Sequence, residues 1–376
     1  MSKPKILFVL NILHPGTGPF QRAIRFDDDR AETTILSCYD TTEQLTAKVA
    51  ALGSTVAGKR LVGLGERGKL RCARALCRFI KQHRPDVIQV NHTFSAVVAT
   101  AFAAIRRSCP SVRFEGTMFE RYGWAKRLGL GMAYAPNSGV IAVSHAINEG
   151  NPLWGGALER RSARRVIYNG VDIAELDRYR HTGDRSAWGI PEDAFVIGSV
   201  SDLKPTKDLP TLLAAVSRMS SPKDWRLLLV GGGPLEADLR AQATELGIAD
   251  RVVFAGQVER REVYRLLDVM DVFAFPTLVE GLSEALVQAM CFEVTPVVSD
   301  IAPNLEVVSP GEHGLVFPAR DVDALSDCLT RLSDDLRLRS RLGLAARQRV
   351  DESFDIYRIV EQYHEFYEEI IDRRAA

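Results

Sequence analysis

Short apolar runs alternate with helix-length amphipathic segments along the whole chain, which is the pattern of parallel α/β architecture. Six of these runs predict strands in the first half of the chain, at 5–10, 33–39, 86–90, 112–117, 139–144 and 165–170. Six more predict strands in the second half, at 195–200, 226–231, 251–256, 272–277, 295–300 and 314–317. The segments between them carry apolar residues at helical spacing, as in Leu235, Leu239, Ala243 and Leu246.

Two segments depart from this rhythm. Residues 171–194 are polar, rich in turn formers and without a strand pattern, so they are interpreted as an inter-domain link. Residues 354–373 predict a helix with an aromatic face. That helix either packs on the domain that precedes it or crosses back to cap the first domain, and both interpretations remain open.

The length of the chain favours two domains, because 376 residues exceed what one hydrophobic core comfortably supports. We therefore predict two Rossmann-like domains facing across a cleft. The first comprises residues 1–170 together with 355–376, and the second comprises residues 171–354.

Charge distinguishes the two halves although the whole chain has a formal net charge of zero. Residues 1–180 hold 27 Lys/Arg and 15 Asp/Glu, and the remainder holds 21 and 33. The excess of cations indicates an anionic partner for the first half: a membrane surface, a phosphorylated acceptor or nucleic acid. The alternative is two solvated surfaces that neutralise each other across the cleft.

The cysteines and the N-terminus indicate a cytoplasmic protein. The six cysteines show no C-x-x-C pairing and no His clusters at metal spacing, so free thiols in a reducing compartment are expected. The chain enters a strand-like run at once, without the pattern of a signal peptide, and no run is long enough to span a membrane. Any membrane contact is therefore expected to be peripheral, at the inner face. The run Asp27–Asp29 is interpreted as surface charge and not as a metal motif.

Three strand ends carry candidate ligand-binding loops, because open α/β sheets bind ligands at the carboxyl ends of their strands. The first loop contains Gly16 and Gly18, and the second is the run of glycines at 231–233. The second is not a dinucleotide fingerprint, since Glu236 stands where glycine or alanine is required.

The third loop follows strand 272–277 and contains three polar residues at intervals of four: Glu280, Glu284 and Gln288. Ser283 is a good N-cap, and Glu284 suits the first turn of the helix that it would begin. Glu280 then lies in the loop before the helix, and Gln288 lies within it. From these residues alone, ligand binding and ordinary capping with a solvated face are both open.

Several segments together resemble one enzyme family over nearly the whole chain. They are "KILFVL…GTGPFQRAI", "RPDVIQVNHT", "VIAVSHAI", "VIYNGVD", "VIGSVSDLKPTKDLPTLLAA", "RLLLVGGGPLEADLRAQATELGIADRVVFAGQV" and "PTLVEGLSEALVQAM". The last resembles the E-x7-E signature of the retaining GT-B glycosyltransferases of family 4, the group 1 family that uses nucleotide-diphosphate sugars. The resemblance implies the GT-B architecture, with the C-terminal helix crossing back to the first domain.

The resemblance also implies roles for individual residues. Glu280 would contact the donor sugar, Lys207 the donor diphosphate, and Gln288 the ribose; Glu280, Lys207 and His92 are the implied catalytic residues. The full donor-binding set on this basis is Gly16, Gly18, Asp202, Lys204, Lys207, Gly232, Gly233, Gln257, Val258, Glu280, Gly281, Leu282, Ser283 and Gln288.

Three positions depart from the family pattern. Asp202 occupies the position of an arginine, Gln288 that of the second glutamate of the signature, and Phe119 that of a histidine. An aspartate repels a diphosphate, whereas Lys204 would compensate in part; the alternative is that Asp202 and Lys204 face solvent. Gln288 loses a charged acceptor pair, which weakens donor binding by about 1–2 kcal/mol.

The function implied is that of a retaining glycosyltransferase of the hexosyltransferase type, expected in polysaccharide biosynthesis. It would use a UDP-sugar as co-substrate, with no cofactor and no metal. The acceptor would be a glycan, a lipid-linked molecule or a small molecule, with anionic character suggested by the basic segments 59–84 and 159–165. Nucleic acid is disfavoured, because no aromatic side chains are interleaved with these charges. The alternatives are a degenerate relative that binds a nucleotide or partner without catalysis, and a sugar-nucleotide epimerase.

Overall fold

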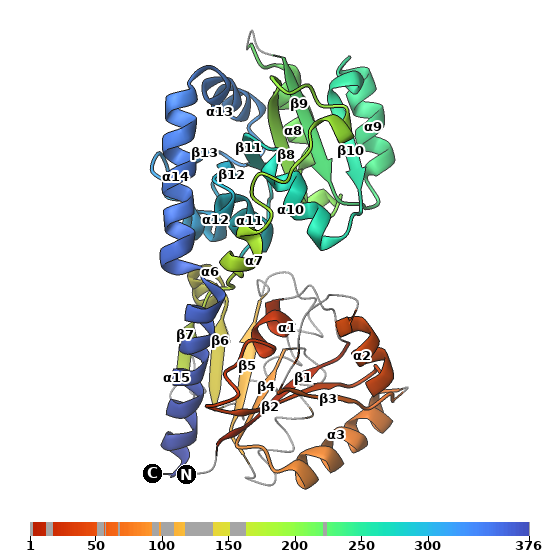
Figure 1. Cartoon of the computed structure of the whole chain (residues 1–376), viewed down its shortest axis with the longest axis vertical. Coiled ribbons are helices and arrows are strands. Elements are labelled where there is room, and N and C mark those ends of the chain that lie inside the picture. Colours follow the sequence, from red (N-terminus) through yellow and green to blue (C-terminus); the bar gives the residue numbers. More distant parts are fainter. Residues whose placement is uncertain are drawn as a thin grey trace. The chain divides into compact units, whose positions relative to one another are not determined.

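The computed structural model describes residues 3–12, 18–50, 56, 58–66, 68–91, 98, 109–116, 138–150, 163–220 and 224–375. The chain forms two compact units (Figure 1). The first comprises Met1–Asn169 and Ile356–Ala376, and the second comprises Gly170–Asp355.

The first unit is built on a seven-stranded sheet in the order β3-β2-β1-β4-β5-β6-β7. Every neighbouring pair runs parallel. The strands are β1 (Lys5–Leu10), β2 (Glu32–Ser37), β3 (Arg60–Gly63), β4 (Val87–Val90), β5 (Ser111–Glu115), β6 (Gly139–Ala142) and β7 (Ala163–Val166). The six predicted strands are present, the first with the predicted bounds and the others with an end shifted by up to four residues.

Strand β3 was not predicted. Its sequence, RLVG, is short, lies at the sheet edge and is only half-buried, so it lacks the long apolar run by which the other strands are found. It lies inside the basic segment 59–84. Only the second part of that segment is helical, as α3 (Lys69–His83).

The other described helices of this unit are α1 (Gly18–Ala23), α2 (Thr42–Ala50), α6 (His145–Glu149) and α15 (Ile356–Ala375). Helix α15 packs its aromatic face on the sheet of the first unit, which confirms the interpretation that the C-terminal helix crosses back. The Tyr367 ring lies 5.8 Å from that of Phe26, and its hydroxyl donates a hydrogen bond to Gln89 in β4. A Cβ on Gly139 of β6 would lie 3.0 Å from the Phe366 ring, so helix and strand are in close contact. Tyr357 departs from the predicted apolar face, being 56% exposed.

The second unit has a six-stranded parallel sheet in the order β10-β9-β8-β11-β12-β13. Its strands are β8 (Phe195–Val200), β9 (Trp225–Val230), β10 (Val252–Gly256), β11 (Val272–Phe275), β12 (Thr295–Ser299) and β13 (Leu315–Phe317). Its longer helices are α8 (Leu209–Ser217), α9 (Glu236–Glu245), α10 (Arg260–Asp268), α11 (Glu284–Cys291), α12 (Ala302–Val307), α13 (Val322–Asp334) and α14 (Leu336–Ser353). All six predicted strands are observed.

Residues 171–194, interpreted as an inter-domain link, belong to the second unit, within the range predicted for the second domain, and hydrogen bonds hold them on it. They contain α7 (Ile173–Asp177) and the 3-10 helix η4 (Ser186–Trp188). The backbone N–H groups of His181 and Gly183 donate to the carboxylate of Asp268, and the Arg185 guanidinium donates to the carbonyl of Val269 (3.0 Å). These anchors come from residues distant in sequence, so the local composition of the segment does not reveal them.

In the sheet of the second unit, β9 and β10 lie on one side of β8, whereas β11, β12 and β13 lie on its other side. The order in which strands are added therefore reverses between β8 and β11. In open α/β sheets such a reversal leaves a crevice at the carboxyl ends of the two strands, where ligands bind. The fold of the second unit therefore places its site among the loops that follow β8, β9 and β11.

The first unit yields a pH-dependent prediction through His364 of α15. Burial lowers the pKa of His364 from its ordinary value of 6.5, and the positive charge of Arg30 lowers it further. Its Nε2 accepts a hydrogen bond from the backbone N–H of Asp27 (3.3 Å), which requires the neutral ring. This histidine binds a proton more readily in the unfolded chain than in the folded one. Its contribution to the free energy of unfolding is therefore complete above pH 6.5 and is lost as the pH falls through the lowered folded pKa.

Thermal unfolding of a His364→Gln variant, followed from pH 7.5 to pH 5, should show a shallower loss of stability than the wild-type protein. Burial also lowers the pKa values of His83 and His313, so a residual slope is expected in the variant. Identical slopes in the two proteins would show that His364 does not titrate on unfolding.

Candidate functional site

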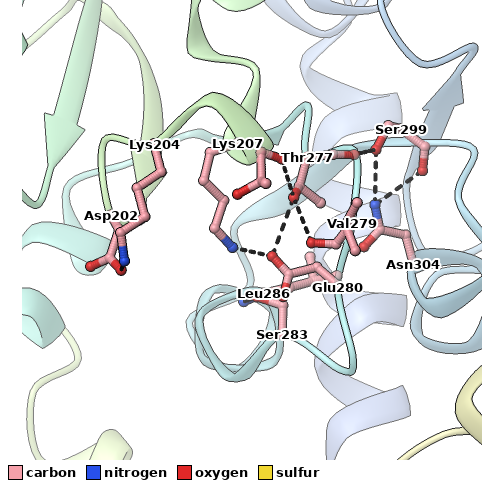
Figure 2. A network of polar contacts seen from close by, with 11 residues as sticks. Asp202, Lys204, Lys207, Thr277, Val279, Glu280, Ser283, Leu286, Ser299 and Asn304 are labelled. Atoms are coloured by element: carbon pink, nitrogen blue, oxygen red, sulfur yellow. Dashed lines mark hydrogen bonds and ion pairs between the residues drawn. The ribbon is translucent and has the colours of Figure 1, made fainter. Parts of the chain in front are cut away.

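Lys207 and Glu280 form an ion pair at the crevice between β8 and β11 (Figure 2). Lys207 ends the 3-10 helix η5 (Pro205–Lys207) after β8, and Glu280 lies in the loop after β11, as predicted. The two side chains are 20% and 14% exposed, and the Lys207 ammonium lies 5.1 Å from the centre of the Phe275 ring. The pair is therefore largely withdrawn from water but open on one side.

The carbonyl oxygen of Thr206 joins the two loops that carry this pair. It accepts hydrogen bonds from the backbone N–H of Leu278 (2.9 Å) and from the hydroxyl of Thr277 (3.1 Å). The same hydroxyl lies 3.3 Å from Glu280 Oε1. Thr277 is fully buried, so these contacts are shielded from competing water.

Ser299 and Asn304 hold the backbone of Thr277 in place through hydrogen bonds, and they were not predicted from the sequence. Ser299 Oγ donates to the Thr277 carbonyl (2.5 Å), and Asn304 Nδ2 donates to the Ser299 carbonyl (3.1 Å). Both residues are buried. Ser299 could have been found from its position at the carboxyl end of the predicted strand 295–300, because ligands of open α/β sheets bind at such strand ends.

Asp202 and Lys204 form a second ion pair, separate from the first (Figure 2). Lys204 Nζ lies 2.6 Å from Asp202 Oδ2, and the side chains are 55% and 63% exposed. The lysine thus neutralises the aspartate. Because both groups are well solvated, the pair has little effect on stability.

Glycines 231 and 233 allow the loop after β9 to lie against the loop after β8. A Cβ on Gly231, whose φ is 128°, would lie 2.0 Å from the Ser201 carbonyl oxygen, and one on Gly233 would lie 2.5 Å from that of Leu203. The Gly232 carbonyl accepts from the Leu203 N–H (3.0 Å). These glycines therefore position residues 201–207. Of the other predicted residues here, Gln257 is exposed and Val258 half-buried.

The start of α11 confirms two predictions. Ser283 is the N-cap, and its hydroxyl accepts from the Leu286 N–H (3.2 Å). Glu284 lies in the first turn, and it also accepts a hydrogen bond from Gln288 Nε2 (3.2 Å), which was not predicted. Gln288 is 8% exposed and keeps its amide against this carboxylate. Burial lowers the pKa of Arg260, but the charges of Tyr264 and Glu284 outweigh this effect and raise it above its ordinary value.

The remaining predicted positions lie in the loop after β11 or in the first unit. Gly281 is half-buried and Leu282 is buried in the loop that also carries Glu280. Gly18 is the first residue of α1 in the first unit, whereas Gly16, His92 and Phe119 lie outside the described residues. In the described part of the chain, no group of three His, Cys, Asp or Glu side chains is arranged to hold a metal ion. Among these residues there is likewise no helix long and apolar enough to cross a membrane.

Comparison with family models gives two matches in the chain. Residues 182–349 match the model of the group 1 glycosyl transferases, and residues 25–175 match that of glycosyltransferase family 4. The protein is 27% identical over 233 residues to the N-acetyl-α-D-glucosaminyl L-malate synthase of Bacillus anthracis, which covers 62% of this chain and 60% of that one.

It is 32% identical over 175 residues to a mannosyltransferase of Corynebacterium glutamicum, described as GDP-mannose-dependent and acting on a monoacylated phosphatidylinositol monomannoside. That match covers 44% of this chain and 45% of the relative, so the chain spans about half the length of the curated relatives it matches. The crystal structure of Anabaena HepE in complex with UDP and glucose superposes with a TM-score of 0.80 and 23% identity, covering 97% and 100% of the two chains. The fold is that of the GT-B glycosyltransferases.

Replacing Thr277 by valine should loosen the connection between the two loops. The substitution removes the hydroxyl that bonds Thr206 and contacts Glu280 while nearly preserving shape, and should lower the free energy of unfolding by about 1–3 kcal/mol. Urea unfolding measures this loss. Thr277→Ser is the matched control, because it retains the hydroxyl. A Thr277→Val variant as stable as the wild-type protein would show that the hydroxyl does not hold the two loops together.

Proposed function

The chain belongs to the group 1 glycosyl transferases, and from this membership we propose that it transfers a sugar from a nucleotide-diphosphate sugar to an acceptor hydroxyl. The observation that carries the proposal is the Lys207–Glu280 pair at the crevice between β8 and β11. A cation and a carboxylate held together there match the two parts of the donor, an anionic diphosphate and a neutral sugar rich in hydroxyls.

Lys207 acts on the diphosphate. Its side chain is 20% exposed, so the field of its ammonium is less screened than that of a surface lysine. Negative charge grows on the phosphate oxygen as the sugar departs, and a fixed cation stabilises that state more than the bound donor. Glu280, released from Lys207 by the incoming phosphate, accepts hydrogen bonds from sugar hydroxyls.

We propose that transfer retains anomeric configuration by attack on the same face as the leaving group. The acceptor oxygen bonds to the anomeric carbon as the bond from that carbon to the diphosphate breaks, and the acceptor proton passes to the released phosphate oxygen. Glu280 lies beside the Thr277 hydroxyl (3.3 Å), and a hydrogen bond from that hydroxyl reduces the nucleophilicity of the carboxylate. That environment supports direct transfer over a covalent intermediate on Glu280.

Gln288 and Glu284 together bind the nucleoside hydroxyls in this proposal. The amide of Gln288 bonds Glu284, one turn nearer the start of α11, so a carboxylate remains beside the position where the family has its second glutamate. The pair retains a charged acceptor that the Gln288 substitution alone would have lost.

The proposed donor is a UDP-sugar and the proposed acceptor is anionic or lipid-linked. HepE, which shares the fold, was crystallised with UDP and glucose, whereas the Corynebacterium relative is described as GDP-mannose-dependent. The names of the two curated relatives contain L-malate and a phosphatidylinositol mannoside, and the first half of this chain carries the excess of positive charge. These features support the choice of acceptor class.

The donor assignment is tested with UDP-, GDP- and ADP-sugars by thermal shift and nucleotide release. A donor at 100 times its Kd should raise the free energy of unfolding by about 2.7 kcal/mol.

Lys207→Ala should lower kcat by about 10²–10³-fold, and Glu280→Ala should reduce both donor-induced stabilisation and turnover. The exposed ion pair Arg218–Asp323 of the same unit provides matched controls, Arg218→Ala and Asp323→Ala, which should leave both readouts unchanged.

The outcomes separate donor binding from turnover. Absence of stabilisation by every nucleotide sugar would contradict the enzyme proposal. Stabilisation that is lost in Glu280→Ala, without turnover of the wild-type protein, is the result expected when the acceptor is missing from the assay. Stabilisation that persists in both Lys207→Ala and Glu280→Ala would place the donor elsewhere.

Asp202→Arg should tighten donor binding. The change removes a negative charge, leaves Lys204 without its partner and restores a cation at the family's arginine position. Because Asp202 is 63% exposed, solvent screening limits the gain to about three- to tenfold in Kd.

Asp224→Arg is the matched control for this variant. Asp224 also pairs with a basic residue, Arg226, but lies at the amino end of β9, away from the strand ends that form the site. Titration calorimetry with the nucleoside diphosphate measures both variants. Equal affinities would mean that Asp202 does not face the diphosphate.

A further inference from the structure

Helix α3 presents one exposed face composed of cations and a single leucine. Arg71, Arg74, Arg78 and Lys81, here named the α3 cationic stripe, are all exposed. At 100° per residue they lie within about 80° of one another around the helix axis. Leu70, 77% exposed, falls on the same side, one turn before Arg74. The helix itself contains no acidic residue.

The opposite face of α3 fixes the orientation of the stripe. Cys72, Leu76 and Ile80 are buried at helical spacing in a core formed with β1, β2 and β4. The helix cannot rotate without withdrawing these side chains from that core. The helix lies at the periphery of the first unit (Figure 1), and the exposed stripe lies on the side of the helix opposite its buried residues.

The stripe is not neutralised by the described surface. None of its four members forms an ion pair or a side-chain hydrogen bond with another residue that the structure describes. By contrast, Arg30 and Arg165 of the same unit each pair with two glutamates of α15. Unpaired cations kept on one face repel each other unless an external anion offsets the charge.

We propose that the α3 cationic stripe docks the first unit on the surface of an anionic phospholipid bilayer. The 15-residue helix is about 22 Å long, so the stripe is too extended for one small anion. A helix face is convex and suits a flat array of phosphate headgroups, each basic residue adding to the attraction. Leu70 enters the boundary between headgroups and acyl chains, as apolar residues of interfacial helices do.

A nucleic acid is the other extended polyanion, and α3 lacks what single-stranded binding requires. Its aromatic residue, Phe79, is half-buried against the core and stacks on His83 (5.0 Å), so it is not presented to a base. Charge with one exposed aliphatic side chain fits a lipid surface better.

Docking goes beyond the proposed sugar transfer and is measured without donor or acceptor, so its failure leaves that proposal intact. The test is co-sedimentation of the full chain with vesicles of phosphatidylcholine alone or of phosphatidylcholine and phosphatidylglycerol in equal parts. Binding is expected only to the anionic vesicles. It should fall steeply as the salt concentration rises from about 0.1 M to about 1 M, since the screening length drops from about 10 Å to about 3 Å.

The decisive comparison is between two double charge reversals. Arg74→Glu/Arg78→Glu should lower the partition coefficient by more than about a hundredfold, since each basic residue near an anionic surface contributes about fivefold. Arg337→Glu/Arg341→Glu, on exposed positions of α14 in the second unit, makes the same change in net charge and should bind as the wild-type protein does. Leu70→Ser should weaken binding by a few-fold at constant charge.

Circular dichroism and urea unfolding of the stripe variant should match the wild-type protein, because the exchanged residues are exposed. Equal losses in the two double variants would show a general charge effect and overturn the proposal. Binding to duplex or single-stranded nucleic acid with none to anionic vesicles would overturn it as well.

Discussion

The carbonyl oxygen of Thr206 is the point on which the arrangement of the site depends. A carbonyl has two lone pairs, and both are used here, by the N–H of Leu278 and the hydroxyl of Thr277. These bonds hold the loop after β8 against the loop after β11, although 71 residues separate Thr206 from Thr277. The Lys207–Glu280 pair is a consequence, because its two members are the neighbours of this junction.

The junction is rigid because its supports are buried and satisfied on several sides. Ser299 and Asn304 hold the Thr277 backbone from the β12 side, while Gly231 and Gly233 let the loop after β9 press against residues 201–203. Buried polar networks of this kind are stabilising only when their members have partners. A site preorganised in this way loses little by reorganisation when charge develops in a reaction.

The sequence predicted the features of this protein that depend on local pattern. Twelve strands were found from apolar runs, and the Ser283 cap from its place before a helix, because both signals lie within a few residues. Strand β3 was missed because it is a short edge strand. The contacts that hold residues 171–194 on the second unit were not predicted because their partners, such as Asp268, are distant in sequence. The contacts of Thr277 with Thr206 and Ser299 were missed for the same reason.

One local contact was nevertheless overlooked. Gln288 and Glu284 are one helical turn apart, a spacing at which side chains meet, yet Gln288 was compared only with the family's glutamate. The comparison showed what had been lost at that position and not what stands beside it. A substitution in a binding site is therefore better judged with its neighbours on the same helix face than alone.

Charge balance explains how the site tolerates Asp202. Asp202 and Lys204 neutralise each other, as do Lys207 and Glu280, so these four described side chains together carry no net charge. Such a site does not accumulate repulsion when empty, whereas an uncompensated cluster of cations would. In the proposed function, a diphosphate would attract Lys207 only by competing with Glu280. The competition would link two events, because the phosphate that takes the lysine would also free the carboxylate for the sugar. Binding of the anionic half of a donor would thereby prepare the contact for its neutral half.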